Sequence, residues 1–143
     1  MDQFSRTVLP AAAESGIRSI VLTMHMPAFR RCIDHDDTVF LVTGCQRPEV
    51  SLTREYLLLL TRQRLVVTRQ SRLTGRVQVH LDAPLSDLDD VVWRTNERGS
   101  AVEFAVTTGD TRHRFFINRG RSRQLWRVNA QFSGLFAPVP ITV

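Results

Sequence analysis

The chain has 143 residues, of which 43% are hydrophobic and 23% charged, a composition that excludes a disordered chain and fits one globular domain. Its net charge is +5, and all 19 basic residues are arginines. The charge is uneven: residues 1–60 carry six arginines and seven acids, whereas residues 61–143 carry thirteen arginines and seven acids. We therefore expect the second half of the chain to favour anionic partners.

The sequence predicts no membrane-spanning segment. Its longest wholly apolar run, residues 56–60, is far shorter than the ~20 residues that cross a bilayer. The first residues lack the basic and apolar segments of a secretory signal. We expect a cytoplasmic protein in which Cys32 and Cys45 are free thiols.

The first 33 residues are predicted to be helical. Pro10 precedes an alanine-rich stretch, and four apolar residues then recur at helical spacing: Ile17, Ile20, Val21 and Met24. This pattern predicts a helix over residues 11–25 and a second short helical piece over residues 27–33, with Pro27 in its first turn. A strand over residues 17–26 is the competing interpretation.

Beyond Asp37, short apolar and β-branched runs separated by turn residues predict seven strands. They cover residues 38–45, 55–61, 64–70, 77–81, 91–95, 101–107 and 111–117. Two sets of alternate apolar residues are each predicted to share one strand face: Val77, Val79 and Leu81, and Val102, Phe104 and Val106. Gly109 and Asp110 predict a tight hairpin. Seven short strands suggest a barrel or a sandwich, and we expect a mainly β, antiparallel barrel.

The helical period returns after Ser122, a plausible N-cap. One face of this predicted helix carries Leu125, Val128, Phe132 and Leu135 or Phe136. Gly134 and Pro138 mark its end, and we expect the helix to close the open mouth of the sheet. The predicted organisation is an N-terminal helical extension (1–33), a β domain (34–137) and a tail (138–143).

Three motifs bear on the fold. Asp36-Asp37-Thr38-Val39 leads into a first strand that ends in Thr43-Gly44; residues 56–68 form an apolar hairpin with the turn Thr61-Arg62-Gln63-Arg64-Leu65; and residues 84–91 read Pro-Leu-Ser-Asp-Leu-Asp-Asp-Val. With these motifs, residues 36–136 resemble the bacterial pleckstrin-homology-like (PH-like) domains, whose superfamily includes GRAM domains. In that family the apolar hairpin is characterised by a Thr-x-x-Arg-Leu turn.

The resemblance implies a PH-like partial barrel of about seven antiparallel strands plugged by a C-terminal helix. It also implies a binding or scaffolding role rather than catalysis. Relatives that bind phosphoinositides carry several basic residues around the first hairpin loop. Here the corresponding loop, residues 44–52, supplies only Arg47, so we do not expect inositol lipid recognition.

Two arginine clusters contain no acid, one over residues 61–76 and one after Asp110. If they lie on neighbouring elements, they form one basic face; the alternative is a solvated exterior that pairs with scattered acids. The candidate binding residues are Arg62, Arg64, Arg69, Arg72, Arg112, Arg114 and Arg121. Alternation places Arg112 and Arg114 on the side of their strand opposite Phe115.

Neither a metal nor a cofactor is expected. His25, Cys32, His35 and Cys45 contain one pair at zinc spacing, Cys32-x-x-His35, without a matched second pair. The aspartates at 34–37 and 87–90 are more simply turn and cap residues. The chain also lacks the motifs of nucleophilic, nucleotide-binding and metalloprotease sites, so no catalytic residue is expected.

These observations together predict a non-enzymatic module that acts through protein–protein or anionic-surface recognition, and self-association is one form of this. A nucleic-acid binder is the alternative, with Trp93 and Trp126 as candidates for base stacking. An anionic membrane lipid binder is the second alternative. Besides the basic face, an exposed strand edge could accept a partner strand.

Overall fold

The computed structural model describes residues 1–47, 56–71, 73–95, 101–118 and 130. Within these ranges the chain forms helices α1 (Gln3–Glu14) and α2 (Ser19–Cys32), followed by the strands and one short 3₁₀ turn. The strands are β1 (Val39–Cys45), β2 (Tyr56–Thr61), β3 (Arg64–Gln70), β4 (Val77–Pro84), β5 (Leu88–Thr95), β6 (Ala101–Thr108) and β7 (Thr111–Asn118), and the 3₁₀ turn is η1 (Leu85–Asp87).

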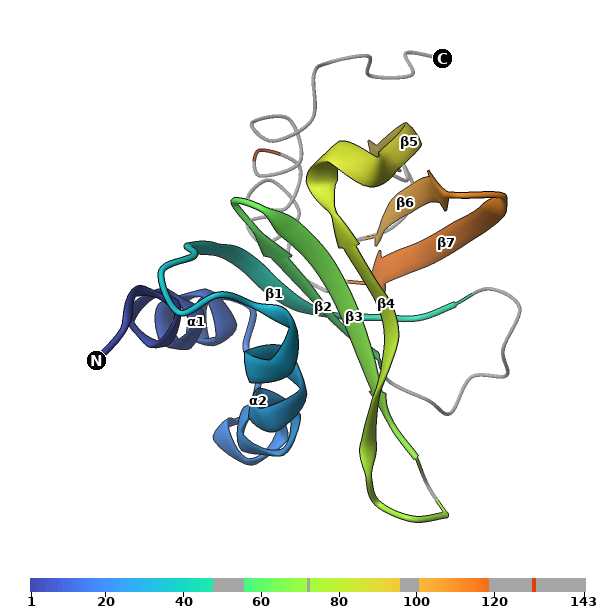
Figure 1. The fold of residues 1–143 in the computed structure, drawn as a ribbon. Helices are drawn as coiled ribbons and strands as arrows, with labels where there is room; N and C mark the ends of the chain where they lie inside the picture. Colours follow the sequence, from blue (N-terminus) through green and yellow to red (C-terminus); the bar gives the residue numbers. More distant parts are fainter. Residues whose placement is uncertain (48–55, 72, 96–100, 119–129, 131–143) are drawn as a thin grey trace.

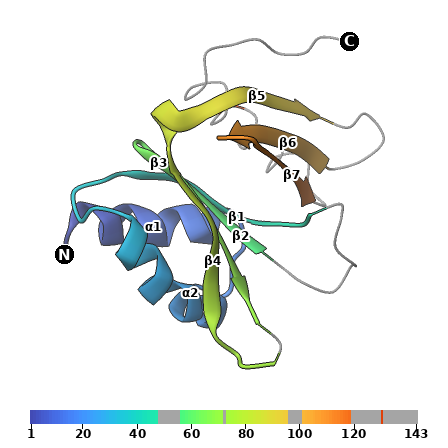
Figure 2. The ribbon, with the colours of Figure 1, turned by 45° about the vertical axis from the view of Figure 1, so that its right-hand side comes forward.

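The strands make two antiparallel sheets, one with the order β1-β2-β3-β4 and one with the order β5-β6-β7 (Figure 1). All seven predicted strands are confirmed, although β4 continues to Pro84 and β5 begins at Leu88. Figure 2 shows three layers: the three-stranded sheet, the four-stranded sheet and the two helices. The mainly β, antiparallel class is therefore confirmed.

The inner strands of the four-stranded sheet, β2 and most of β3, are buried on both of their faces. Every residue of β2 is buried, with Leu58 and Leu60 packed between the two sheets and Leu57 and Leu59 packed against the helices. A strand covered on both faces needs a continuous apolar run rather than alternation. This requirement explains why residues 56–60 are all apolar.

A closed barrel is the expectation that the described residues contradict. The two sheets stay open, and they meet through a backbone bridge at one corner, where Gln46 and Phe116 exchange N–H···O bonds of 2.8 and 2.7 Å. Strand β4 ends at Pro84, which has no amide hydrogen to donate, and η1 then turns the chain before β5 begins. The chain thus starts a second sheet instead of completing the first.

The predicted N-terminal helix boundaries are wrong, and so is the competing strand over residues 17–26. The break falls at Gly16 (φ +71°), where the Gly16 and Ile17 amides donate to the Ala13 and Ala12 carbonyls. This is a Schellman cap, and it requires the left-handed conformation that glycine adopts at least cost. Pro27 instead lies inside α2.

The helices form the third layer through buried apolar residues. Phe4 and Val8 of α1 and Leu22 and Phe29 of α2 pack against the outer face of the four-stranded sheet. This packing outweighs the backbone hydrogen bond that Pro27 costs α2. Residues 1–33 therefore share a core with the sheet.

The predicted common face of Val77, Val79 and Leu81 is wrong, because β4 contains a bulge at His80. Val67 pairs with Leu81, whereas Thr68 pairs with Val79, so two steps of β4 oppose one step of β3. Leu81 is buried between the sheets, while Val79 is exposed. A bulge reverses the alternation of a strand, and this one could not be seen in the sequence.

The predicted common face of β6 and the predicted turn before β7 are both confirmed. Val102, Phe104 and Val106 share the buried face of β6, and Gly109 (φ +59°) forms the predicted turn before β7. The predicted helix after Ser122, with Trp126, lies outside the described residues.

Candidate anion-binding site

The three-stranded sheet has one buried face and one outward face. Trp93, Phe104 and Phe115 point into the core between the sheets. Their neighbours in sequence therefore point outward, and the register aligns three of these, Val92, Ala105 and Arg114, in a row across β5, β6 and β7. Small Ala105 thus lies at the centre of the outward face.

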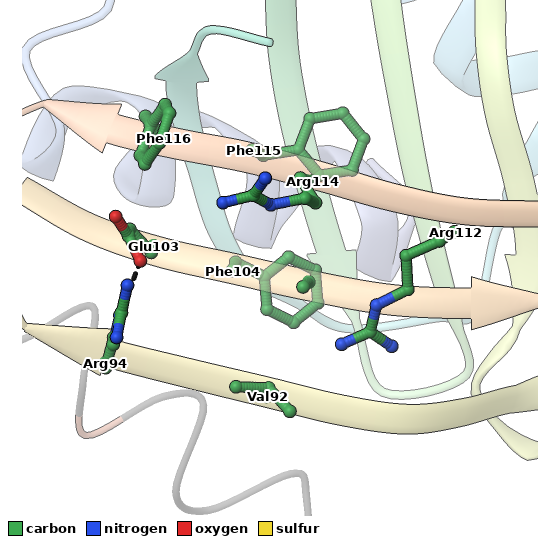
Figure 3. A pocket seen from close by; sticks show the side chains of 9 residues that line it. Val92, Arg94, Glu103, Phe104, Arg112, Arg114, Phe115 and Phe116 are labelled. Atoms are coloured by element: carbon green, nitrogen blue, oxygen red, sulfur yellow. Dashed lines mark hydrogen bonds and ion pairs between the residues drawn. The ribbon is translucent and has the colours of Figure 1, made fainter. Parts of the chain in front are cut away.

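A cavity of about 200 Å³ opens over this row (Figure 3). Its lining includes Val92, Arg94, Glu103, Ala105, Arg112, Arg114 and Phe116, and we call it the arginine hollow. The next row, Arg94–Glu103–Phe116, borders it on one side of Ala105, and Arg112, which pairs with Thr107, borders it on the other. Three long arginine side chains around one alanine account for its concave shape.

Arg112 is held in place by two neutral oxygens. Its Nη1 donates to the backbone carbonyl of Asp90 at 2.6 Å and to Oγ1 of Thr107 at 3.0 Å. The carbonyl is presented by a bulge in β5, where Asp90 has a φ of +49°. These bonds orient the guanidinium without neutralising its charge, so it is organised to bind an anion.

The other two arginines differ in their partners. The Arg94 guanidinium pairs with the Glu103 carboxylate, with Nε and Oε2 2.5 Å apart. Arg114 is exposed, and its guanidinium makes no hydrogen bond or ion pair with another side chain of the described ranges. The hollow therefore brings three guanidinium groups around one carboxylate, and it can hold an anionic group by charge-assisted hydrogen bonds.

The five predicted basic residues that the structure describes do not form one face. Arg62 is exposed in the turn between β2 and β3, and Arg64 beside it pairs with Asp82, with Nε and Oδ1 2.8 Å apart. Arg69 lies at the other end of β3, about 15–20 Å from Arg64 along a strand of this length, and its Nη2 donates to Gln78 Oε1 at 3.2 Å. Arg72 and Arg121 lie outside the described residues.

Arg112 and Arg114 are the two predicted residues that the structure brings together, on the outward face expected from alternation. Arg94 joins them and was missed. Its signal was the Trp93-Arg94 alternation in β5, but its neighbours on β6 depend on a register shift between Asp89 and Val92. Sequence alone does not reveal that shift.

The candidate metal residues are placed apart or in structural roles. The described residues contain no group of three His, Cys, Asp or Glu side chains that could hold a metal ion. His25 is buried, with Nδ1 2.7 Å from Thr68 Oγ1. Burial, and then the nearby Asp82 carboxylate, raises the pKa of Cys32 to about 11, which keeps it a thiol at neutral pH.

Asp37, one of the aspartates before β1, is also structural. Its Oδ1 accepts a bond of 2.7 Å from the Thr38 amide, and its Oδ2 accepts a bond of 2.6 Å from the Thr61 hydroxyl. Thr61 Oγ1 in turn accepts bonds from the Gln63 and Arg64 amides. The Thr-x-x-Arg-Leu turn is thus anchored by a buried carboxylate.

Comparison with known proteins found no family model that matches this sequence and no curated protein that is similar to it. Neither helix of the described part of the chain is long and apolar enough to cross a membrane.

Proposed function

We propose that this chain is a non-enzymatic, cytoplasmic binding module of PH-like fold that recognises an anionic group on a partner protein through the arginine hollow. The observation that carries the proposal is the arrangement of Arg94, Arg112 and Arg114 around Ala105 with a single carboxylate, Glu103, among them. A preorganised cluster of arginines suits planar, bidentate binding of carboxylate or phosphate.

The PH-like part of the proposal is supported by architecture. Antiparallel sheets of four and three strands enclose one core, in simple chain order. The Thr61 turn, one of the motifs that carry the resemblance, is tied by a hydrogen bond to Asp37 at the entry to β1. Two of the three motifs that carry the resemblance are therefore in contact in the structure.

A protein partner fits the hollow better than a nucleic acid does. A cavity of about 200 Å³ receives one anionic group rather than a phosphate chain, and Glu103 within it would repel a second phosphate. Single strands also need exposed aromatic rings for stacking. Trp93, one of the two candidates for that role, is only 4% exposed, so it packs in the core and is not accessible to a base.

The test is a fluorescence anisotropy titration with a labelled hexaglutamate peptide. Arg112→Gln/Arg114→Gln should weaken binding at least about tenfold, because charge-assisted hydrogen bonds are lost. The matched control is Arg62→Gln, which removes an exposed arginine from the opposite sheet and should leave the affinity unchanged.

Two results would overturn the proposal. One is equal affinity for the wild type and the double variant. The other is stronger binding of a mixed single-stranded oligonucleotide, with an affinity that falls steeply with salt, which would favour the nucleic-acid alternative.

A further inference from the structure

The hairpin between β3 and β4 ends in an exposed aliphatic side chain. Leu73 is 95% exposed, the highest value among the large hydrophobic residues of the described ranges. Figure 1 shows this hairpin extending beyond both sheets, away from the three-stranded sheet that carries the arginine hollow. The hairpin tip (residues 71 and 73–76) is thus a second feature, separate from the hollow.

The hairpin tip is a well-bonded turn. The Ser71 amide donates to the Arg76 carbonyl at 2.8 Å, and the Gly75 amide donates to the Ser71 carbonyl at 2.9 Å. Gly75 has a φ of +69°, and its carbonyl accepts from Gln70 Nε2 at 3.2 Å. These bonds hold the base of the turn together, and Leu73 lies exposed beyond them.

The surroundings of Leu73 are basic. Residues 61–81 contain five arginines and no acid. Asp82, at the far end of the hairpin, pairs with Arg64. Near the tip, Arg76 is exposed, and the half-buried Arg69 guanidinium is bonded to the neutral Gln78, so the charge of these two arginines is not neutralised by a neighbouring acid of the hairpin.

The first turn of α2 lies at the same end of the molecule. His25, in the middle of α2, contacts Thr68 of β3, and the thiol of Cys32, at the last residue of α2, lies near Asp82 and Arg64 at the far end of the hairpin. The start of α2 is therefore directed toward the tip (Figure 1). It carries the exposed Arg18 and Ile20, and Ile20 is 66% exposed.

We infer that the hairpin tip and the start of α2 dock together on an anionic bilayer surface. Leu73 and Ile20 insert into the interface between headgroups and acyl chains, and the arginines contact the acidic headgroups. A convex, projecting tip suits a flat surface. Nucleic acid is disfavoured because aliphatic side chains do not stack on bases.

This docking is weak, reversible and sensitive to salt. Two aliphatic side chains and a few arginines give an affinity comparable to that of a single lipid anchor, which by itself holds a protein only marginally. At about 0.1 M salt, the attraction between the arginines and the acidic headgroups is screened beyond about 10 Å. The inference is independent of the arginine hollow.

The test is co-sedimentation of the full chain with vesicles of phosphatidylglycerol and phosphatidylcholine, against vesicles of phosphatidylcholine alone. Wild type should sediment with the anionic vesicles and be released by added salt. Leu73→Asn should weaken partitioning at least about tenfold, and Arg76→Gln about fivefold. Because both side chains are exposed, neither variant should change the thermal unfolding midpoint.

The matched control is Leu9→Asn, which removes another exposed leucine (51% exposed) from α1; it should partition like wild type. A second readout is Leu73→Trp, whose added emission should shift to the blue with anionic vesicles. The inference is overturned if wild type does not sediment with anionic vesicles, if Leu73→Asn partitions like wild type, or if Leu9→Asn weakens partitioning as much as Leu73→Asn.

Discussion

At the scale of single residues, buried polar groups occupy positions that determine how the layers pack. His25 is the clearest example, since it is buried between α2 and β3 with Nδ1 against the Thr68 hydroxyl. The hydrogen bond satisfies one ring nitrogen, but a charged imidazolium at this position would lose its hydration. Burial accordingly lowers the pKa of His25 from 6.5 to about 4.

This shift makes stability depend on pH in a defined direction. The unfolded chain takes up the His25 proton near pH 6.5 and the folded chain near pH 4, so protons favour unfolding in that window. Stability should be complete above pH 6.5 and fall by up to about 3 kcal/mol as the pH drops to 4.

Urea unfolding at pH 7.5, 5.5 and 4.5 would measure this loss. His25→Gln can retain a hydrogen bond to Thr68 but does not titrate, so its stability should fall less than that of wild type over the same range. Parallel losses in both proteins would show that carboxylates alone cause the acid sensitivity.

Alternation alone was sufficient to predict the outward positions of Arg112 and Arg114. It was not sufficient for Arg94 or for Val79, because each depends on a bulge that shifts the register of its strand. A bulge is stabilised by contacts with other elements, and these are not encoded in the periodicity of one segment. Sequence therefore predicted two of the three arginines of the hollow.

At the scale of elements, the strands and the two N-terminal helices were predictable, but the boundaries of those helices were not. Strand runs were delimited by turn residues such as Gly109, whereas Pro10 and Pro27 suggested helix starts at the wrong places. Both prolines lie inside helices, because packing on the sheet compensates for their missing hydrogen bonds. Gly16 carried the correct boundary signal.

Gly16→Ala tests the importance of that boundary. The left-handed conformation at Gly16 is unfavourable for alanine, although no atom lies within 4 Å of the added Cβ, so backbone strain alone should cost about 1–2 kcal/mol. Gly44→Ala is the control, since Gly44 has open space and no positive φ. Chemical denaturation would measure both, and equal stabilities would contradict the assigned cap.

At the scale of the whole molecule, the four-stranded sheet is the middle layer, and it packs against the three-stranded sheet on one face and the helices on the other. Strand β2 contributes residues to both cores. Loss of packing between the helices and the sheet should therefore also lower the stability of the core between the two sheets. Phe29 of α2 is fully buried against the sheet, so a substitution there tests this coupling.

Phe29→Ala should destabilise the protein by about 3–5 kcal/mol. Far-ultraviolet circular dichroism and tryptophan fluorescence, to which Trp93 between the sheets contributes, should report the same shifted unfolding transition. If the fluorescence transition kept its wild-type midpoint while the helical signal was lost, the helices would be a separate unit.

The arginine hollow belongs to the outermost layer and is central to the proposed function. The most direct measurement is a nuclear magnetic resonance titration of ¹⁵N-labelled protein with the hexaglutamate peptide. The amide shifts should concentrate on Arg94, Glu103, Ala105, Arg112 and Arg114, with little change at Arg62 or Arg69. Shifts centred on Arg62 and Arg69, with the amides of the hollow unmoved, would contradict the proposed site.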